Sequence, residues 1–228
     1  LATGNITRNW VSLVPSAPEV FPPSPREDDP LTVVVPVRNV GTAYPSSFDV
    51  VAVLEGPEGN ATATATVLGV RPGDDFPATF VFAPKRGAHT VRVTVDPGGA
   101  SGDALRNDNT VQAPIFVGGF EVLLTPVKSI TSLAPLATDS FLLSYQNRGN
   151  VADRFTFAYG ASQGWAVTLN ASAVDLGPGL SAFARGTLQA PDRVLSGEAA
   201  SVWISATSGG NQSVGDRVEF KVFVAQSP

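Results

Sequence analysis

The chain has 228 residues, 43% hydrophobic and only 15% charged, with 22 Gly, 19 Pro and a formal net charge of −5. The charged fraction lies below the roughly 25% of an average soluble domain, and this composition is typical of a loop-rich β protein rather than a helical bundle. With no Cys and one His, His89, the sequence excludes disulfides, thiolate catalysis, Cys-ligated metals and His-paired zinc sites.

The chain begins with Leu1 and contains no Met, so we expect a processed or excised segment whose leader has been removed. No apolar run approaches the roughly 20 residues that a membrane span requires, so we expect no membrane span in this segment. The 15 Lys and Arg residues are scattered singly. They form no basic stripe for phosphate backbones, and nucleic acid is therefore not an expected partner.

Alternation of apolar and polar residues predicts strands with one buried face throughout the first half of the chain. These strands are residues 10–14, 31–40, 48–54, 62–70, 76–82, 89–95 and 110–117. The Pro-rich segment 15–25 lacks amide donors, and we expect it to be an edge strand that crosses between sheets.

The second half repeats this plan, with predicted strands at residues 120–127, 140–146, 154–159, 165–170, 182–188, 201–206 and 214–224. Three pairs of turn motifs recur at offsets of 108, 106 and 107 residues: Asn39-Val-Gly41 and Asn147-Arg-Gly149, Pro72-Gly73 and Pro178-Gly179, Ala83-Pro84 and Ala190-Pro191. Offsets this constant indicate duplication of one module.

Seven short strands in about 100 residues predict an immunoglobulin-like sandwich. We therefore expect an all-β chain of two tandem immunoglobulin-like (fibronectin-III-like) seven-stranded β-sandwiches, residues 1–117 and 118–228, joined by the short link Gly118-Gly119. Such a short link predicts a stiff, end-to-end arrangement. The residues expected to point into the cores include Phe80, Phe82, Val91, Val93, Phe155, Phe157 and Trp203.

Four segments of the first module, Thr32–Thr42, Leu68–Gly73, Gly87–Pro97 and Asn107–Thr110, resemble the CARDB family, a cell-adhesion-related domain of bacterial and archaeal surface proteins. The resemblance covers nearly all of residues 10–117. It implies an immunoglobulin-like fold and an exported structural or adhesive role, with no catalytic residues to transfer. His89 departs from the family pattern, because an aromatic residue, often Tyr, is expected there.

The second module, residues 119–226, looks like a related group of immunoglobulin-like sandwich domains found beside secreted glycosidases and in archaeal surface proteins. The matching residues are Tyr145–Asp153, Leu176–Gly179 and Ala190-Pro191. This resemblance implies a surface or accessory role for the second module.

Four N-x-[ST] motifs begin at Asn5, Asn60, Asn170 and Asn211. All four lie at predicted strand ends or loops, where a bulky polar glycan can face water, and they make N-glycosylation the expected modification. Ordinary Asn residues in turns are the alternative.

The loop from Asp96 to Asn109 supplies Asp96, Asp103 and Asp108, which are the hard oxygen ligands that calcium takes. The spacing does not match an EF-hand, and Asp, Asn and Gly are also the usual residues of a long turn. An ordinary long turn is thus the favoured interpretation of this loop, and a calcium site is the alternative. Calcium is the only cofactor that the sequence suggests.

The Trp side chains and the single His are candidates for a sugar-binding surface and for a catalytic base. Trp10, Trp165 and Trp203 could form a sugar-stacking platform, but Trp165 and Trp203 are expected in the cores. His89 lies near no nucleophile motif such as G-x-S-x-G, and we expect a surface or boundary imidazole.

Because no catalytic motif is matched, we do not expect an enzyme. The leading hypothesis is a non-catalytic exported cell-surface protein with a structural or adhesive role, such as an S-layer protein, a surface fibre or pilus-like subunit, or an adhesin stalk. The alternative is a carbohydrate-binding or accessory module of a larger secreted hydrolase.

The expected partners are other copies of the chain, neighbouring surface proteins and glycans. Residues 1–14, with the alternating Val11 and Leu13, have two possible roles. Either they add as a strand to a neighbouring copy and propagate a fibre, or they form an ordinary first strand of their own module.

Overall fold

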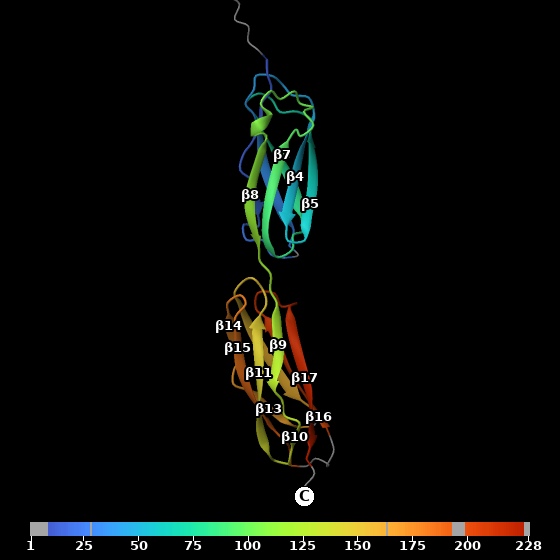
Figure 1. Ribbon diagram of the computed structural model, residues 1–228, viewed down its shortest axis with the longest axis vertical. Helices are drawn as coiled ribbons and strands as arrows, with labels where there is room; N and C mark the ends of the chain where they lie inside the picture. Colours follow the sequence, from blue (N-terminus) through green and yellow to red (C-terminus); the bar gives the residue numbers. More distant parts are fainter. Residues whose placement is uncertain (1–8, 28, 163, 193–198, 226–228) are drawn as a thin grey trace, which may run out of the picture. The chain divides into compact units, whose positions relative to one another are not determined.

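The computed structural model describes residues 9–27, 29–162, 164–192 and 199–225. The chain divides into two compact units, residues 1–119 and 120–228 (Figure 1). The fold is all-β, as predicted, because the described residues form strands and a single-turn 3-10 helix, η1 (Arg106–Asp108). Gly118 belongs to the first unit, since its N–H donates to Pro25 O and its carbonyl accepts from Glu27 N.

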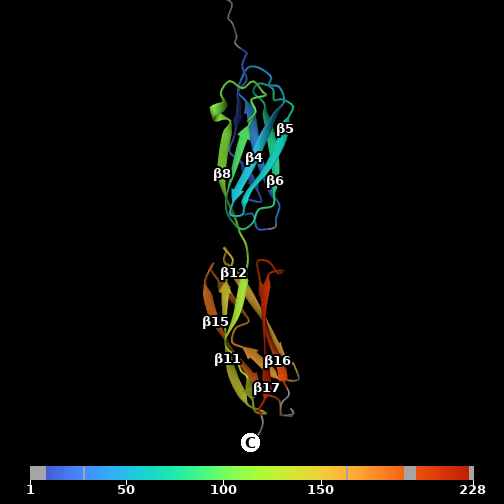
Figure 2. The ribbon, with the colours of Figure 1, turned by 45° about the vertical axis from the view of Figure 1, so that its right-hand side comes forward.

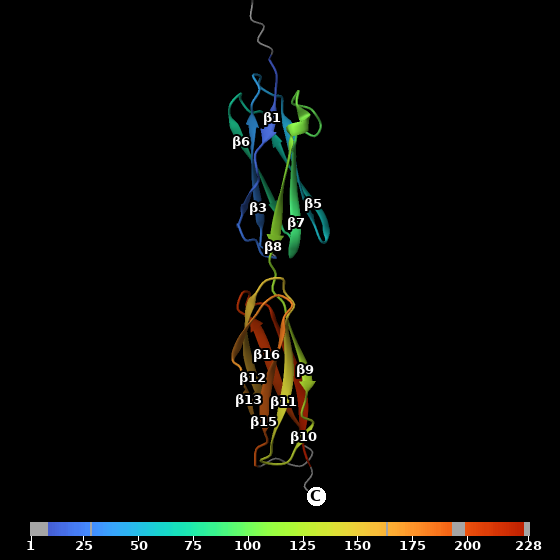
Figure 3. The same ribbon diagram turned by 60° about the vertical axis from the view of Figure 1, so that its left-hand side comes forward.

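The first unit contains eight strands in its described part: β1 (Leu13–Pro15), β2 (Glu19–Phe21), β3 (Leu31–Asn39), β4 (Phe48–Gly56), β5 (Gly59–Val67), β6 (Asp75–Phe82), β7 (Gly87–Val95) and β8 (Thr110–Val117). One sheet has the order β5-β4-β7-β8 (Figure 1). In the other, β3 pairs along one edge with β6 and along its second edge with β1 and β2. All of these pairs are antiparallel. Figure 3 shows β1, β3 and β6 of this sheet.

The Pro-rich segment first follows one edge of β3. β1 pairs with residues 37–39 of β3 and β2 pairs with residues 32–34. Between them, Ser16 N donates to Pro36 O at 2.8 Å. The prediction of an edge strand is therefore confirmed. The segment ends at the other sheet, as predicted, because Pro25 O accepts from the N–H of Gly118, the residue that follows β8.

The core of the first unit lies between its two sheets and follows from the alternation in the sequence. Val91, Val93 and Val95 of β7 are fully buried, whereas Arg92 between them is exposed. Phe80 and Phe82 of β6 point into the same core from the opposite sheet. The predicted core residues of this unit are all confirmed.

The second unit contains nine strands in its described part: β9 (Val122–Lys128), β10 (Ser132–Leu133), β11 (Thr138–Asn147), β12 (Asp153–Ala161), β13 (Ala166–Leu169), β14 (Ala173–Leu176), β15 (Ser181–Gln189), β16 (Ala199–Ser208) and β17 (Gly215–Val224). One sheet has the order β10-β17-β16-β12-β14 and the other β13-β15-β11-β9. Figure 2 shows β11 beside β15 and β16 beside β17. The predicted strands omitted the short strands β10 and β14, while β2 lies in the segment expected to be an edge strand.

Phe155 is fully buried in the core of the second unit and Phe157 packs half-buried against it. The prediction for Trp203 is wrong. Its neighbours Val202 and Ile204 are fully buried, so the alternation along β16 places Trp203 on the opposite, outer face of the sheet.

Equivalent turns confirm that the motif pairs recur in the structure. In the first unit, Asn39 Nδ2 donates to Ala43 O and Val70 O, while Asn39 Oδ1 accepts from Gly41 N. In the second, Asn147 makes the same three bonds with its own surroundings, to Val151 O, Leu176 O and Gly149 N. Each buried amide thus joins the loop that follows it to a second loop about 30 residues later in the chain.

The Pro-Gly turns are equivalent as well. Gly73 N donates to Asn39 O at 2.8 Å, and Gly179 N donates to Asn147 O at 2.8 Å. Both glycines have φ in the left-handed region, at 86° and 73°, where a side chain would be strained. The Asn-x-Gly and Pro-Gly motifs are therefore two halves of one structural feature.

Candidate functional site

The buried carboxylate of Asp96 organises the loop that follows β7. Its Oδ1 accepts from Ala100 N at 2.7 Å, and its Oδ2 accepts from Ser101 N and from Ser101 Oγ. The residue is 2% exposed and has a φ of 49°, a conformation that Asp tolerates because its side chain bonds nearby backbone. Asp96 is thus engaged in closing its own turn.

Asp103 connects this loop to the start of the unit. Its Oδ1 accepts from Leu105 N and its Oδ2 from Leu13 N, each at 2.9 Å. Ala104 N also donates to Val11 O. The carboxylate therefore anchors the segment that leads into β1.

Asp108, in η1, is exposed. Within the described part of the chain, no group of three or more His, Cys, Asp or Glu residues lies close enough to hold a metal ion. The structure therefore does not assemble Asp96, Asp103 and Asp108 into a ligand set, because the two buried carboxylates accept backbone amides instead.

The residues leading into β1 lie within their own unit. Val11 and Leu13 are buried in the first core, and β1 pairs with β3 of the same chain. The structure thus has the cis-paired arrangement that the sequence analysis gave as one of two roles.

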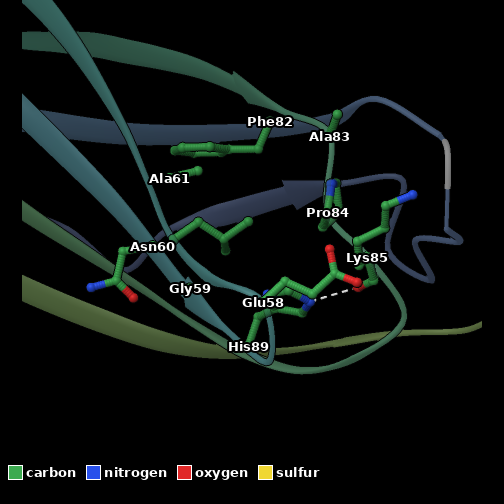
Figure 4. A pocket seen from close by; sticks show the side chains of 10 residues that line it. Glu58, Gly59, Asn60, Ala61, Phe82, Ala83, Pro84, Lys85 and His89 are labelled. Carbon is green, nitrogen blue, oxygen red and sulfur yellow. Dashed lines mark hydrogen bonds between the residues drawn. The ribbon is translucent and has the colours of Figure 1, made fainter.

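Three of the four glycosylation motifs lie among the described residues, and their Asn side chains are exposed. Asn60 is the second residue of β5, and its amide points away from the Phe82 ring (Figure 4). Asn170 follows β13, and its Oδ1 accepts from Arg185 N at 2.9 Å. Asn211 Oδ1 accepts from both the N–H and the hydroxyl of Ser213, the third residue of its motif. Asn5 lies outside the described residues.

A pocket of about 160 Å³ lies beside the β4–β5 turn, lined in part by Glu58, Phe82 and Lys85 (Figure 4). His89 forms one wall and is 8% exposed. Its Nε2 donates to Lys85 O at 2.6 Å. The side chain is thus buried at the end of the core, beside the pocket, and not on the surface.

The lack of a side chain at Gly56 leaves room for the His89 ring beside this turn. A Cβ at Gly56 would come within 2.1 Å of His89 Nδ1, which is buried and has no hydrogen-bond partner among the described residues. The ring therefore packs directly against the backbone of the turn, and the geometry gives it a packing role.

In neither unit do Trp side chains come together to form a sugar-stacking surface. Trp165 is buried in the second core, as predicted. Trp203 lies on the outer face, over Gly160, and the Arg217 guanidinium covers its ring at 4.9 Å from the centroid. Trp10 belongs to the first unit and is exposed. Stacking of a sugar on Trp203 would require Arg217 to move.

The open edge of β5 was not expected from the sequence. In the described part of the chain, β4 is the only strand that pairs with β5, and it does so from Gly59 to Val67. The signal was present in the run Asn60-Ala-Thr-Ala-Thr-Ala-Thr66, which alternates without a charged residue or a Pro.

No helix among the described residues is long and apolar enough to span a membrane.

The CARDB family model matches residues 13–113. No curated protein matches the chain. Among solved structures, alpha-2-macroglobulin of Escherichia coli activated by porcine elastase is 13% identical, with 99% of this chain and 23% of that chain covered and a TM-score of 0.38. Salmonella alpha-2-macroglobulin reacted with methylamine is 12% identical, with 95% and 16% covered and a TM-score of 0.39. Red sea bream transglutaminase is 14% identical, with 98% and 32% covered and a TM-score of 0.32. This chain spans less than a third of each.

Proposed function

Because its first unit contains a CARDB domain, we propose that this chain is a non-catalytic, exported protein of the cell surface with a structural or adhesive role. That family match is the observation that carries the proposal. The immunoglobulin-like character of both units and N-glycosylation of the exposed sequons are part of the same proposal.

The use of the buried carboxylates supports a structural role. Asp96, Asp103 and Asp153 are all less than a tenth exposed, and each accepts hydrogen bonds from backbone amides. Asp153 Oδ2 also accepts from Ser208 Oγ. These groups satisfy loops and strand ends, so they are committed to holding the fold.

The shifted ionisable groups support the same interpretation. A backbone hydrogen bond from Ser140 lowers the pKa of Asp139, which is exposed on β11. Burial raises the pKa of the Tyr145 phenol within the second core. Functional sites tend to gather shifted groups in a cleft, whereas each of these two shifts follows from the position of its residue in a strand.

Glycosylation is supported by the placement of Asn60, Asn170 and Asn211, whose side chains all reach water. A bulky polar chain requires such a position. The three residues lie at the start of a strand, after a strand and in a turn, so a glycan at any of them leaves the hydrophobic cores intact.

Intact-mass measurement of the natively produced protein tests the modification. We expect a mass above that of the unmodified polypeptide, to which residues 1–228 contribute 23.6 kDa, with the excess reduced by N60Q, N170Q or N211Q. The matched control is N107Q, which alters an exposed Asn outside any N-x-[ST] motif and should leave the mass excess unchanged. An unmodified mass for the native protein would remove glycosylation from the proposal, while the surface role is tested separately by labelling intact cells.

A further inference from the structure

The β5 strand is an open edge of its sheet. It has nine residues, pairs with β4 along its whole length without a bulge, and lies at the border of the sheet β5-β4-β7-β8 (Figure 1). An edge strand directs the N–H and C=O groups of alternate residues away from its partner, and these groups can pair with another strand.

The other edge strands of the described part carry the features that natural proteins use to block such pairing. β6 contains Asp75 and Pro77, β8 contains Pro114, and β9 contains Pro126 and Lys128. The remaining edges, β1, β2, β10, β13 and β14, have at most four residues each. Only β5 among the described edges is both long and without a Pro or a charged residue.

The two faces of β5 are chemically uniform. Its register with the buried Val50, Ala52 and Leu54 of β4 places one row of side chains on the core side, namely Ala61, Ala63 and Ala65. The alternate row, Thr62, Thr64 and Thr66, is exposed on the outer face. A strand with small residues on one face and β-branched hydroxyls on the other fits a second copy of itself, because no charges meet and no large side chains clash.

We propose that β5 is the surface through which two copies of this chain associate, edge to edge and antiparallel, about a two-fold axis. Pairing over the full strand, Gly59 to Val67, places the axis at Ala63. In this register Ala61 lies opposite the partner's Ala65, and Thr62 lies opposite the partner's Thr64. A two-fold contact of this kind is closed, and it joins two four-stranded sheets into one sheet of eight strands.

The occupant is a second copy rather than an unrelated peptide because the register and the composition are self-complementary. A partner chosen for charge would require a charged group along the strand, and β5 offers none. Asn60 projects from the Thr face and not along the edge. Pairing through β5 therefore requires neither the proposed function nor glycosylation.

Charge substitution at Thr64 tests the contact. In the proposed register the two copies of Thr64 lie diagonally across the pair, within reach of long side chains. We expect the unmodified chain to show a dimer by sedimentation at concentrations up to about 1 mM, T64K and T64E each to be monomeric, and an equal mixture of the two variants to dimerise. The matched control T110K, on the outer face of the β8 edge, should dimerise like the unmodified chain. A chain that stays monomeric, or one whose association T64K and T64E leave unchanged, would overturn the proposal.

A single introduced Cys tests the register, since the chain has none of its own. Residues directly opposite in an antiparallel pair have Cα atoms about 4.5–5.5 Å apart, which suits a disulfide. We expect A63C to form a covalent dimer on mild oxidation, well ahead of A113C, the matched half-buried Ala on the β8 edge. Equal cross-linking of the two variants would contradict pairing through β5, and so would faster cross-linking of A113C.

Discussion

Asp216 Oδ2 accepts a hydrogen bond from Leu124 N at 2.7 Å, across 92 residues of the second unit. The first unit contains the same relationship, because Asp103 Oδ2 accepts from Leu13 N at 2.9 Å across 90 residues. In both units a carboxylate from near the end of the module fixes the strand that begins it. The duplication seen in the turn motifs therefore extends to a contact that has no local signature in the sequence.

Replacing either carboxylate by its amide should loosen the first strand of that unit. In D103N one of the two accepting oxygens becomes an NH₂ group, which leaves one backbone amide without an acceptor at a cost of about 1–3 kcal/mol. Hydrogen-exchange mass spectrometry should show faster exchange at residues 11–15 in D103N and at residues 122–126 in D216N. The exposed D108N is the control. Unchanged exchange in both variants would show that these bonds do not hold the strands.

Removing the buried side-chain amide of Asn39 or Asn147 should lower the free energy of unfolding several times more than a typical surface substitution does. N39A removes three hydrogen bonds and leaves Val70 O and Gly41 N buried without their partners, so we expect a loss of about 2–3 kcal/mol. N39D keeps the acceptor for Gly41 N but cannot donate, and it should recover little. Urea unfolding of N39A, N39D and the equivalent N147A measures the losses; a loss below about 0.5 kcal/mol, typical of surface changes, would contradict this role.

Trp203 and Phe155 should differ sharply in their effect on stability. F155A opens a cavity in the second core and should cost about 3–5 kcal/mol. W203A removes a ring from the outer face, where it covers Gly160 and stacks under Arg217, and should cost less than half as much. Denaturant unfolding of the two variants makes the comparison. Equal losses of unfolding free energy in the two variants would contradict the position of Trp203 on the outer face.

Tyr145 should make the second unit sensitive to alkaline pH. Burial raises the pKa of its phenol above the usual 10.0, so above that pH the unfolded chain releases the proton before the folded one. The unfolded state then binds fewer protons, and stability falls as the pH rises. Y145F keeps the ring and removes the proton, so we expect it to lose less unfolding free energy than the unmodified chain between about pH 9 and pH 11. An identical decline in both proteins would rule Tyr145 out as the source.

The sequence predicted the features that depend on local periodicity and turn chemistry. Val91 and Val93 face the core because β7 alternates, and Gly73 and Gly179 occupy turns that need a positive φ. Trp203 was misplaced because its size suggested the core, while the alternation of Val202 and Ile204 around it already assigned it to the outer face. The alternation along the strand therefore predicted the position of Trp203 better than the size of its side chain did.

Other features depend on contacts that no local pattern encodes. Asp96 and Asp103 suggested metal ligands by type, but their role depends on amides brought near by the fold, including one 90 residues away. The short strand β10 exists only because it pairs with β17, about 90 residues later in the chain. The run Asn60–Thr66 has no charged residue and no Pro, but its place at the edge of the sheet follows only from the pairing order of the strands.

Labelling intact cells with a membrane-impermeant amine reagent tests whether the protein lies on the cell surface. Lys85, Lys128 and Lys221 are exposed in the structure, so a protein on the cell surface offers reactive amines to the medium. We expect cells that produce the native protein to carry label on these three lysines before any lysis, at the level reached after lysis. Label that appears only once the cells are broken would contradict a surface role.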